Sequence, residues 1–216
     1  MNSVLYNLDI IGPLSALVYL FFRKPKVEGA FLWLILFVVS LFICNLSAFL
    51  VQQVPIFFGK KPGVNLFVYH IGCAFYVIIL SKFFSLVLKS KYLIIDCLFF
   101  IPFLILSVLN IIYLNRTFTI YGVTSIWVVI KCLSYYTQKF QEPPKEDLLQ
   151  NRLFWIISGL FLYFSVAFFT FITYDFFTIG ILKGVMPKSV GAFWLVHNII
   201  LAVSCLFYIK AIECKE

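Results

Sequence analysis

The chain has 216 residues, of which 63% are hydrophobic and only 12% carry a charge, and its mean hydropathy is +1.04. Soluble domains contain roughly 45–50% apolar and about 25% charged residues, so a water-soluble fold of this length cannot hide so many apolar side chains. The excess indicates a lipid environment, and in that setting the formal charge of +8 fits the basic flanks of membrane spans rather than nucleic-acid binding.

Seven segments of the chain are long and apolar enough to cross a bilayer, which takes about 20 residues. They lie at residues 3–22, 29–51, 64–87, 92–113, 117–136, 153–175 and 191–210. The connections between them are short, so we expect consecutive spans to run antiparallel. The sequence therefore predicts an all-α fold, an integral membrane bundle of seven transmembrane helices forming a single domain over residues 1–216.

The distribution of basic residues predicts the orientation of this bundle. Twelve of them fall on the side that includes Arg23, Lys139 and Lys210, against five on the side of Lys60 and Lys188. Because Lys and Arg are enriched in cytoplasmic loops, we expect the N-terminus outside and the C-terminus in the cytoplasm. Residue usage, with 27 Phe and abundant Ile, Lys and Asn, is typical of an AT-rich bacterial genome. The predicted location is therefore the bacterial inner (cytoplasmic) membrane.

Polar side chains within the spans gather near the predicted outer ends. Such residues are costly in hydrocarbon, so they indicate functional sites. The candidate ligand-binding residues are His70, His197, Asn198, Asn45, Asp175, Tyr69 and Trp194. His70 and His197 each lie about 9 Å below their outer helix ends at ~1.5 Å per residue. This pattern favours an outward-facing polar pocket for a small ligand or an ion. The alternative is that helix ends are polar in general and that Tyr and Trp form an interfacial belt.

Four residues at similar depth suggest a second hypothesis, a zinc site. His70, His197, Asp9 and Asp175 include the His and carboxylate ligands of catalytic zinc, which would suit a metal-dependent hydrolase acting on lipid. The chain has no HxxxH or HExxH pair, no glycine-rich phosphate loop and no nucleophile–base motif. The sequence therefore favours a protein without enzymatic activity and names no catalytic residue. It predicts no cofactor, with zinc left open as an alternative.

Three motifs resemble a known type of protein. They are Tyr69-His70-Ile71, the stretch 152–170 and His197-Asn198-Ile199-Ile200. The strongest part of the stretch 152–170 runs from Phe154-Trp155 through Gly159 to Tyr163 and Ser165. They resemble small bacterial seven-span proteins, mostly uncharacterised, which occur alone or as the N-terminal membrane part of sensor histidine kinases. The resemblance implies a sensory or receptor-like module that signals through a cytoplasmic or membrane partner. The contact regions would be the loop 137–152 and the C-terminal end.

The leading hypothesis is thus a receptor-like or sensor-like protein whose ligand shifts the helices by binding one arrangement better than another. The metal-dependent hydrolase, and a small carrier or structural subunit of a membrane complex, remain as alternatives. The sequence leaves the ligand, the partner protein and the oligomeric state open.

Overall fold

The structure of the chain, a computed structural model, describes residues 7–57, 66–88, 105, 118–141, 147–179 and 187–214. Its helices are α2 (Leu8–Arg23), α3 (Gly29–Phe57), α4 (Leu66–Val87), α6 (Phe118–Gln141), the 3₁₀-helix η2 (Leu148–Gln150), α7 (Arg152–Ile179) and α8 (Pro187–Glu213). Within the described residues all regular structure is helical, which confirms the all-α prediction.

The described helices correspond to six of the seven predicted spans. The fourth predicted span, 92–113, lies outside the described residues apart from Ile105, so the structure shows six α-helices in its described part rather than seven. Several helices are longer than predicted: α3 continues to Phe57 and α8 to Glu213. The length of an apolar run corresponds to the thickness of the hydrocarbon core. The helix itself can continue beyond that core into the interfacial region, because its backbone hydrogen bonds do not depend on apolar side chains.

Four of the described helices contain stretches long and apolar enough to cross a membrane. These are Gly29–Pro55, Val68–Val87, Arg152–Thr173 and Ala192–Glu213. Helix α2 has 16 residues, which is shorter than a usual span, and α6 contains more polar side chains than the others. The four apolar helices indicate that this chain is a membrane protein.

The outer surface of the bundle supports the same conclusion. Large apolar side chains are exposed on every one of the described α-helices, including Val18, Ile43, Phe75, Ile130, Phe169 and Leu206. Monomeric soluble proteins rarely expose large contiguous apolar patches. A surface that is apolar on all its helices is the one that hydrocarbon solvates.

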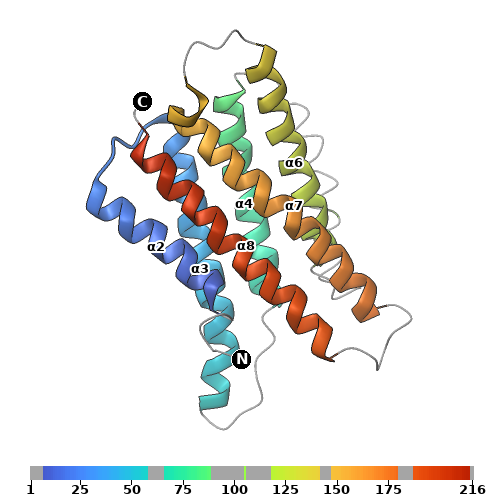
Figure 1. Cartoon of the computed structure of the whole chain (residues 1–216). Coiled ribbons are helices and arrows are strands. Elements are labelled where there is room, and N and C mark those ends of the chain that lie inside the picture. Colours follow the sequence, from blue (N-terminus) through green and yellow to red (C-terminus); the bar gives the residue numbers. More distant parts are fainter. Residues whose placement is uncertain are drawn as a thin grey trace.

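The six described α-helices form a closed ring in which each packs most extensively against two neighbours. The order around the ring is α2, α3, α4, α6, α7 and α8, and α8 then contacts α2 again (Figure 1). The start of α2 and the end of α8 lie toward opposite ends of the bundle. Phe37 occupies the centre, because its ring contacts Tyr76 of α4 and Phe164 of α7 at centroid distances of 5.5 and 6.0 Å.

Helices α4 and α6 are neighbours that run parallel. Cys73 Sγ lies 3.2 Å from Thr124 Oγ1, and further along both helices the Phe84 and Trp127 rings are 6.1 Å apart. Residue numbers therefore rise in the same direction along the two helices. Helix α4 ends at one end of the bundle, and α6 begins at the other.

Gly159 allows an unusually close approach between α7 and α8. A Cβ atom at this position would stand 2.7 Å from Tyr208 Cε1 and 3.1 Å from the Ser204 carbonyl oxygen. Small residues let helix backbones approach closely in membranes, where dispersion contacts hold helices together. Gly159 is therefore a packing residue at the α7–α8 contact.

Candidate functional site

The predicted ligand-binding residues lie in the half of the bundle that contains the start of α2. His70, His197, Asn198 and Asn45 are buried, and Tyr69 and Trp194 are partly buried against the core. Asp175 lies on α7, but its side chain is outside the described part of the structure. The described members of the set thus share one half of the bundle, and their depth in the membrane stays a prediction.

His197 is held by aromatic rings from α7 and α8. Its Nε2 atom lies 3.4 Å from the Tyr163 hydroxyl, and its ring centroid is 5.1 Å from Phe171 and 5.4 Å from Trp194. Its Nδ1 atom is buried and finds no hydrogen-bond partner among the described residues. A buried polar atom left without a partner costs free energy, so this nitrogen is a candidate contact for a ligand.

Tyr69 and Tyr121 extend this group of rings from α8 across to α4 and α6. The Tyr69 ring lies 6.1 Å from Trp194 and 6.2 Å from Tyr121, measured between ring centroids. Both contacts are edge-to-face. Tyr121 in turn lies 6.4 Å from Tyr76 and 4.6 Å from Phe171. We call the connected rings the aromatic cluster: Tyr69, Tyr76, Tyr121, Tyr163, Phe171, Trp194 and His197.

Asp9 and Asn45 bring α2 and α3 to the same region. The Asn45 side-chain amide donates to the backbone carbonyl of Asp9 at 3.1 Å. Asp9 lies within electrostatic range of the hydroxyl groups of Tyr69 and Tyr163. Its Oδ1 atom is buried with no hydrogen-bond partner among the described residues. Two atoms beside the aromatic cluster, Asp9 Oδ1 and His197 Nδ1, therefore lack a hydrogen-bond partner among the described residues.

The predicted zinc site is not assembled by His70, His197 and Asp9. Among the residues that the structure describes, no group of three or more His, Cys, Asp or Glu side chains lies close enough to hold a metal ion. His70, His197 and Asp9 do not form such a group, and the side chain of Asp175, the fourth predicted ligand, lies outside the described part of the structure. Depth follows from sequence position, whereas convergence also depends on how each helix is rotated about its axis.

A cavity of about 430 Å³ lies between α3 and α4, at the edge of the bundle. We call it the α3–α4 groove, lined by Ser40, Ile43, Cys44, Ser47, Val68, Ile71, Gly72 and Phe75. Its lining is almost entirely apolar, so it is not the polar pocket predicted from the sequence. The sequence contains a signal for it, since Ser40, Cys44 and Ser47 have the spacing that places small residues on one helix face.

Cys44 connects the groove to the aromatic cluster. It lines the groove, and its thiol is within hydrogen-bonding reach of the Tyr76 and Tyr121 hydroxyls. The Sγ atom also lies 3.6 Å from the carbonyl oxygen of Val68. A molecule in the groove would therefore contact a side chain that touches the cluster directly.

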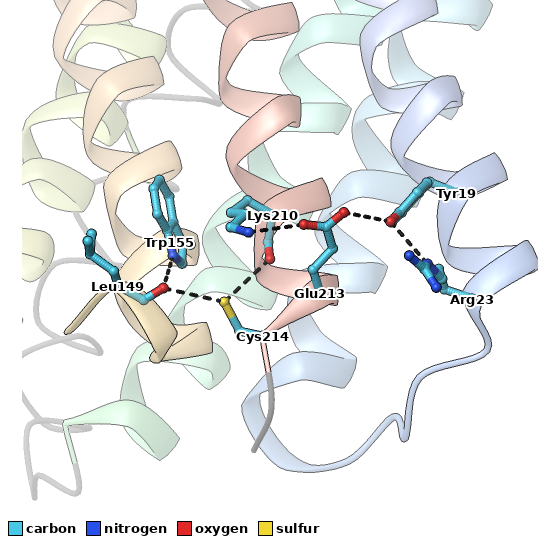
Figure 2. Close-up of polar contacts among 7 residues, drawn as sticks. All are labelled: Tyr19, Arg23, Leu149, Trp155, Lys210, Glu213 and Cys214. Atoms are coloured by element: carbon cyan, nitrogen blue, oxygen red, sulfur yellow. Dashed lines mark hydrogen bonds and ion pairs between the residues drawn. The ribbon is translucent and has the colours of Figure 1, made fainter. Parts of the chain in front are cut away.

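A polar network closes the opposite end of the bundle (Figure 2). Glu213 accepts from the Tyr19 hydroxyl at 2.9 Å and from Lys210 Nζ at 3.1 Å, and Arg23 Nε donates to the same tyrosine oxygen at 3.1 Å. This network joins α2 to the last turn of α8. Because its members are exposed, it positions the helix ends more than it stabilises the fold.

The start of α7 is attached to the same end of α8. Arg152 Nη2 donates to the Cys214 carbonyl oxygen at 3.2 Å, and Trp155 Nε1 donates to the Leu149 carbonyl oxygen at 2.8 Å (Figure 2). The Cys214 thiol also points to Leu149, with Sγ 3.8 Å from that oxygen. Burial raises the pKa of the Cys214 thiol above its usual range.

No protein-family model, curated protein or solved structure matches this chain. The resemblance to sensor-type membrane proteins therefore remains an expectation from sequence motifs. The case for a function depends on the contacts described above.

Proposed function

We propose that this chain is a receptor-like or sensor-like membrane protein. It binds a small ligand or an ion in the half of the bundle that contains the aromatic cluster, and it signals through a partner at the opposite end. One observation carries the proposal: His197 and Asp9 each bury a polar atom that has no hydrogen-bond partner among the described residues. Polar groups inside a membrane bundle are costly and are usually functional.

A ligand with polar groups would offset that cost. A donor could pair with Asp9 Oδ1, and the aromatic rings around His197 would supply apolar contact. Ligand sites are mostly apolar with a few polar groups that fix orientation. A ligand that satisfied both atoms in one helix arrangement only would shift the bundle toward that arrangement.

Helices α7 and α8 provide a physical route from the cluster to the opposite end. Tyr163 and His197 connect them within the cluster, and Arg152 connects the start of α7 to the carbonyl oxygen of Cys214. A rotation or shift of α8 at His197 would therefore also move Glu213 and its contact with Tyr19. A partner protein at that end would detect the altered positions of α2, α7 and α8.

The basic residues support an orientation with this end in the cytoplasm of a bacterial cell. Arg23 and Lys210 belong to the network at the end of α8, Arg152 bonds Cys214 beside it, and Lys24 and Lys26 follow the end of α2 in the sequence. The enrichment of Lys and Arg on the cytoplasmic side then places the aromatic cluster in the outer half of the membrane.

The parallel pair α4 and α6 supports a seventh span. Parallel neighbours in a membrane require the chain between them to cross back, and α4 and α6 are separated by residues 89–117. That segment includes the apolar run 92–113, which has the length that a crossing needs. We therefore include this run as a span in the proposed seven-span topology.

A thermal-shift screen of the purified protein in detergent tests the ligand proposal. A library of small amines, carboxylates and metal ions is added, and the unfolding temperature is measured for the native chain, for His197→Ala, for Asn198→Ala and for Ser134→Ala. Ser134 is a partly exposed α6 serine whose hydroxyl donates to the Ile130 carbonyl of its own helix, which makes its variant the matched control. We expect at least one compound to stabilise the native chain and Ser134→Ala but not the other two variants. Stabilisation that persists in His197→Ala and Asn198→Ala would contradict the proposed site.

A further inference from the structure

The α3–α4 groove lies at a depth where lipid hydrocarbon is the surrounding medium. Its lining on α3 runs from Ser40 to Ser47, which corresponds to about 10 Å along the helix axis. This stretch falls well inside the candidate span Gly29–Pro55. The groove therefore opens toward acyl chains, away from the water on either side.

The walls of the groove favour an apolar occupant. Ile43, Ile71 and Phe75 border it and are each 55% exposed. Water in a cavity needs two to four polar partners, which a lining with almost no polar surface does not offer. An empty groove would lack dispersion contacts along its whole lining. Hydrocarbon supplies those contacts, so it is the occupant that fits the groove best.

A second copy of this chain fits the groove less well than a lipid chain does. Helices that associate in membranes usually do so across small residues that allow their backbones to approach. Gly72 is the glycine of the groove, and the space beside it is already taken by Cys44, whose Sγ lies 2.5 Å from where a Gly72 Cβ would stand. A partner helix would therefore meet Ile43, Ile71 and Phe75, whereas a flexible acyl chain can follow the hollow between them.

Two exposed glutamines of α3 mark the depth at which the polar interface begins. Gln52 and Gln53 lie about 8 Å beyond Ser47 at ~1.5 Å per residue, toward the end of the bundle opposite the end of α8. With 3.6 residues per turn, both lie on other faces of α3 than the groove-lining residues, so they indicate the level of the lipid head and are not proposed as its contacts. One phospholipid can thus place its head at this level and extend one chain down to Ser40.

We infer that the α3–α4 groove binds one acyl chain of a membrane phospholipid and that this chain contacts the aromatic cluster through Cys44. The inference names a ligand class for the proposed receptor and in that respect rests on the proposed function. The lipid enters from the side, between α3 and α4, and its terminal methylenes lie against Ser40 and Cys44. The binding itself is a property of the groove and can be measured without any signalling readout.

Photochemical labelling in vesicles tests the inference. The protein is reconstituted into phosphatidylcholine vesicles that contain a small fraction of phosphatidylcholine with a diazirine near the middle of one acyl chain. After illumination, labelled peptides are quantified by mass spectrometry. We expect adducts on the α3 and α4 peptides that contain Ile43, Ile71 and Phe75 to saturate as the probe fraction rises. Adducts at Ile126 and Ile130 of α6, which contact bulk lipid, should rise in proportion to the probe.

Filling the groove provides the decisive comparison. Ser40→Leu places a larger side chain in the hollow, and we expect it to lower the saturable labelling roughly tenfold, the factor that about 1.4 kcal/mol of binding free energy represents. Ser134→Leu makes the same change on the exposed face of α6 and should leave the α3 and α4 labelling unchanged. Ser47→Leu replaces Ser40→Leu if the latter elutes as an aggregate in size-exclusion chromatography.

The outcomes separate this inference from the proposed function. Labelling of α3 and α4 that does not saturate, or that survives both groove-filling variants, would overturn the lipid site. Cross-linked protein dimers through α3 and α4 without lipid adducts would also overturn it and would identify a second copy as the occupant. A further measurement compares the distance between spin labels at the ends of α2 and α8 with and without phospholipid in detergent. Saturable labelling with no change in that distance would support the lipid site and contradict the role of the lipid as a signalling ligand.

Discussion

Gly12 of α2 lies so close to Ala202 of α8 that a Cβ atom at Gly12 would stand 2.9 Å from the Ala202 Cα atom. The first and last described α-helices thus meet backbone to backbone. The contact closes the ring of helices, since α8 otherwise contacts α7 on its other side. The Tyr19–Glu213 contact lies further along the same two helices, so residue numbers rise in the same direction along α2 and α8.

Replacing Gly12 by alanine should destabilise the bundle. The new methyl group meets the backbone of α8, which cannot rotate away, and overpacking of this kind typically costs about 1–3 kcal/mol. The free energy of unfolding in mixed micelles, titrated with a denaturing detergent, measures the loss. Gly122→Ala is the matched control, because its Cβ would stand 3.3 Å from Cγ1 of Ile172, a side chain that can adjust. Equal losses in the two variants would show that the α2–α8 approach is not as tight as described.

Variants of Tyr163 and His197 should distinguish the effect of their contact on the free energy of unfolding from its effect on ligand binding. Tyr163→Phe removes the hydroxyl near Nε2 and should lower the free energy of unfolding by about 1 kcal/mol, because His197 then loses a hydrogen-bond partner. Adding His197→Leu replaces both partners with apolar groups, which is often close to neutral. We therefore expect the double variant to regain the lost stability, as measured by thermal unfolding in detergent.

The same double variant should still fail to respond to a ligand that stabilises the native chain. A double variant less stable than Tyr163→Phe would contradict this expectation, since His197 would then be a packing residue that leucine cannot replace. Retained ligand stabilisation in the double variant would exclude His197 from the site.

The positions of the helices could be predicted from sequence because hydrocarbon imposes a length on each apolar run. The predicted span 153–175 corresponds to Arg152–Ile179, and 191–210 corresponds to Pro187–Glu213. The depth of His197 follows from the same count. Apolar side chains surround each of these helices, however, so the pattern does not fix which face turns inward.

The rotation of each helix therefore had to come from the structure. Tyr163 faces His197, and this pairing has no signal in hydropathy. The α3–α4 groove was missed for the same reason, because Gly72 and Cys44 belong to different helices and become neighbours only on packing. Asp9 and His70 were grouped by depth alone, and that grouping is not sufficient to build a metal site.

The connection between α2 and α3 should be accessible from the cytoplasm only. Lys26 and Glu28 form an exposed ion pair there, so a cysteine at Lys26 will be open to solvent. We expect Lys26→Cys to resist a membrane-impermeant maleimide in intact cells and to react after permeabilisation. The native chain controls for its own six cysteines. Labelling of Lys26→Cys in intact cells would contradict the proposed orientation.

The Cys214 thiol should react slowly with a maleimide at neutral pH and faster at alkaline pH. The thiolate is the reactive form, and burial raises the pKa of this thiol.

The parallel arrangement of α4 and α6 predicts that the two ends of the segment between them lie on opposite sides of the membrane. In the full-length chain, Lys89→Cys follows the end of α4 and Arg116→Cys precedes the start of α6. Because α4 ends at the same end of the bundle as the C-terminus, Lys89→Cys should be protected in intact cells, and Arg116→Cys should react with the impermeant maleimide. Reaction of both or of neither in intact cells would show that the chain does not cross between α4 and α6, and the proposed seventh span would then be wrong.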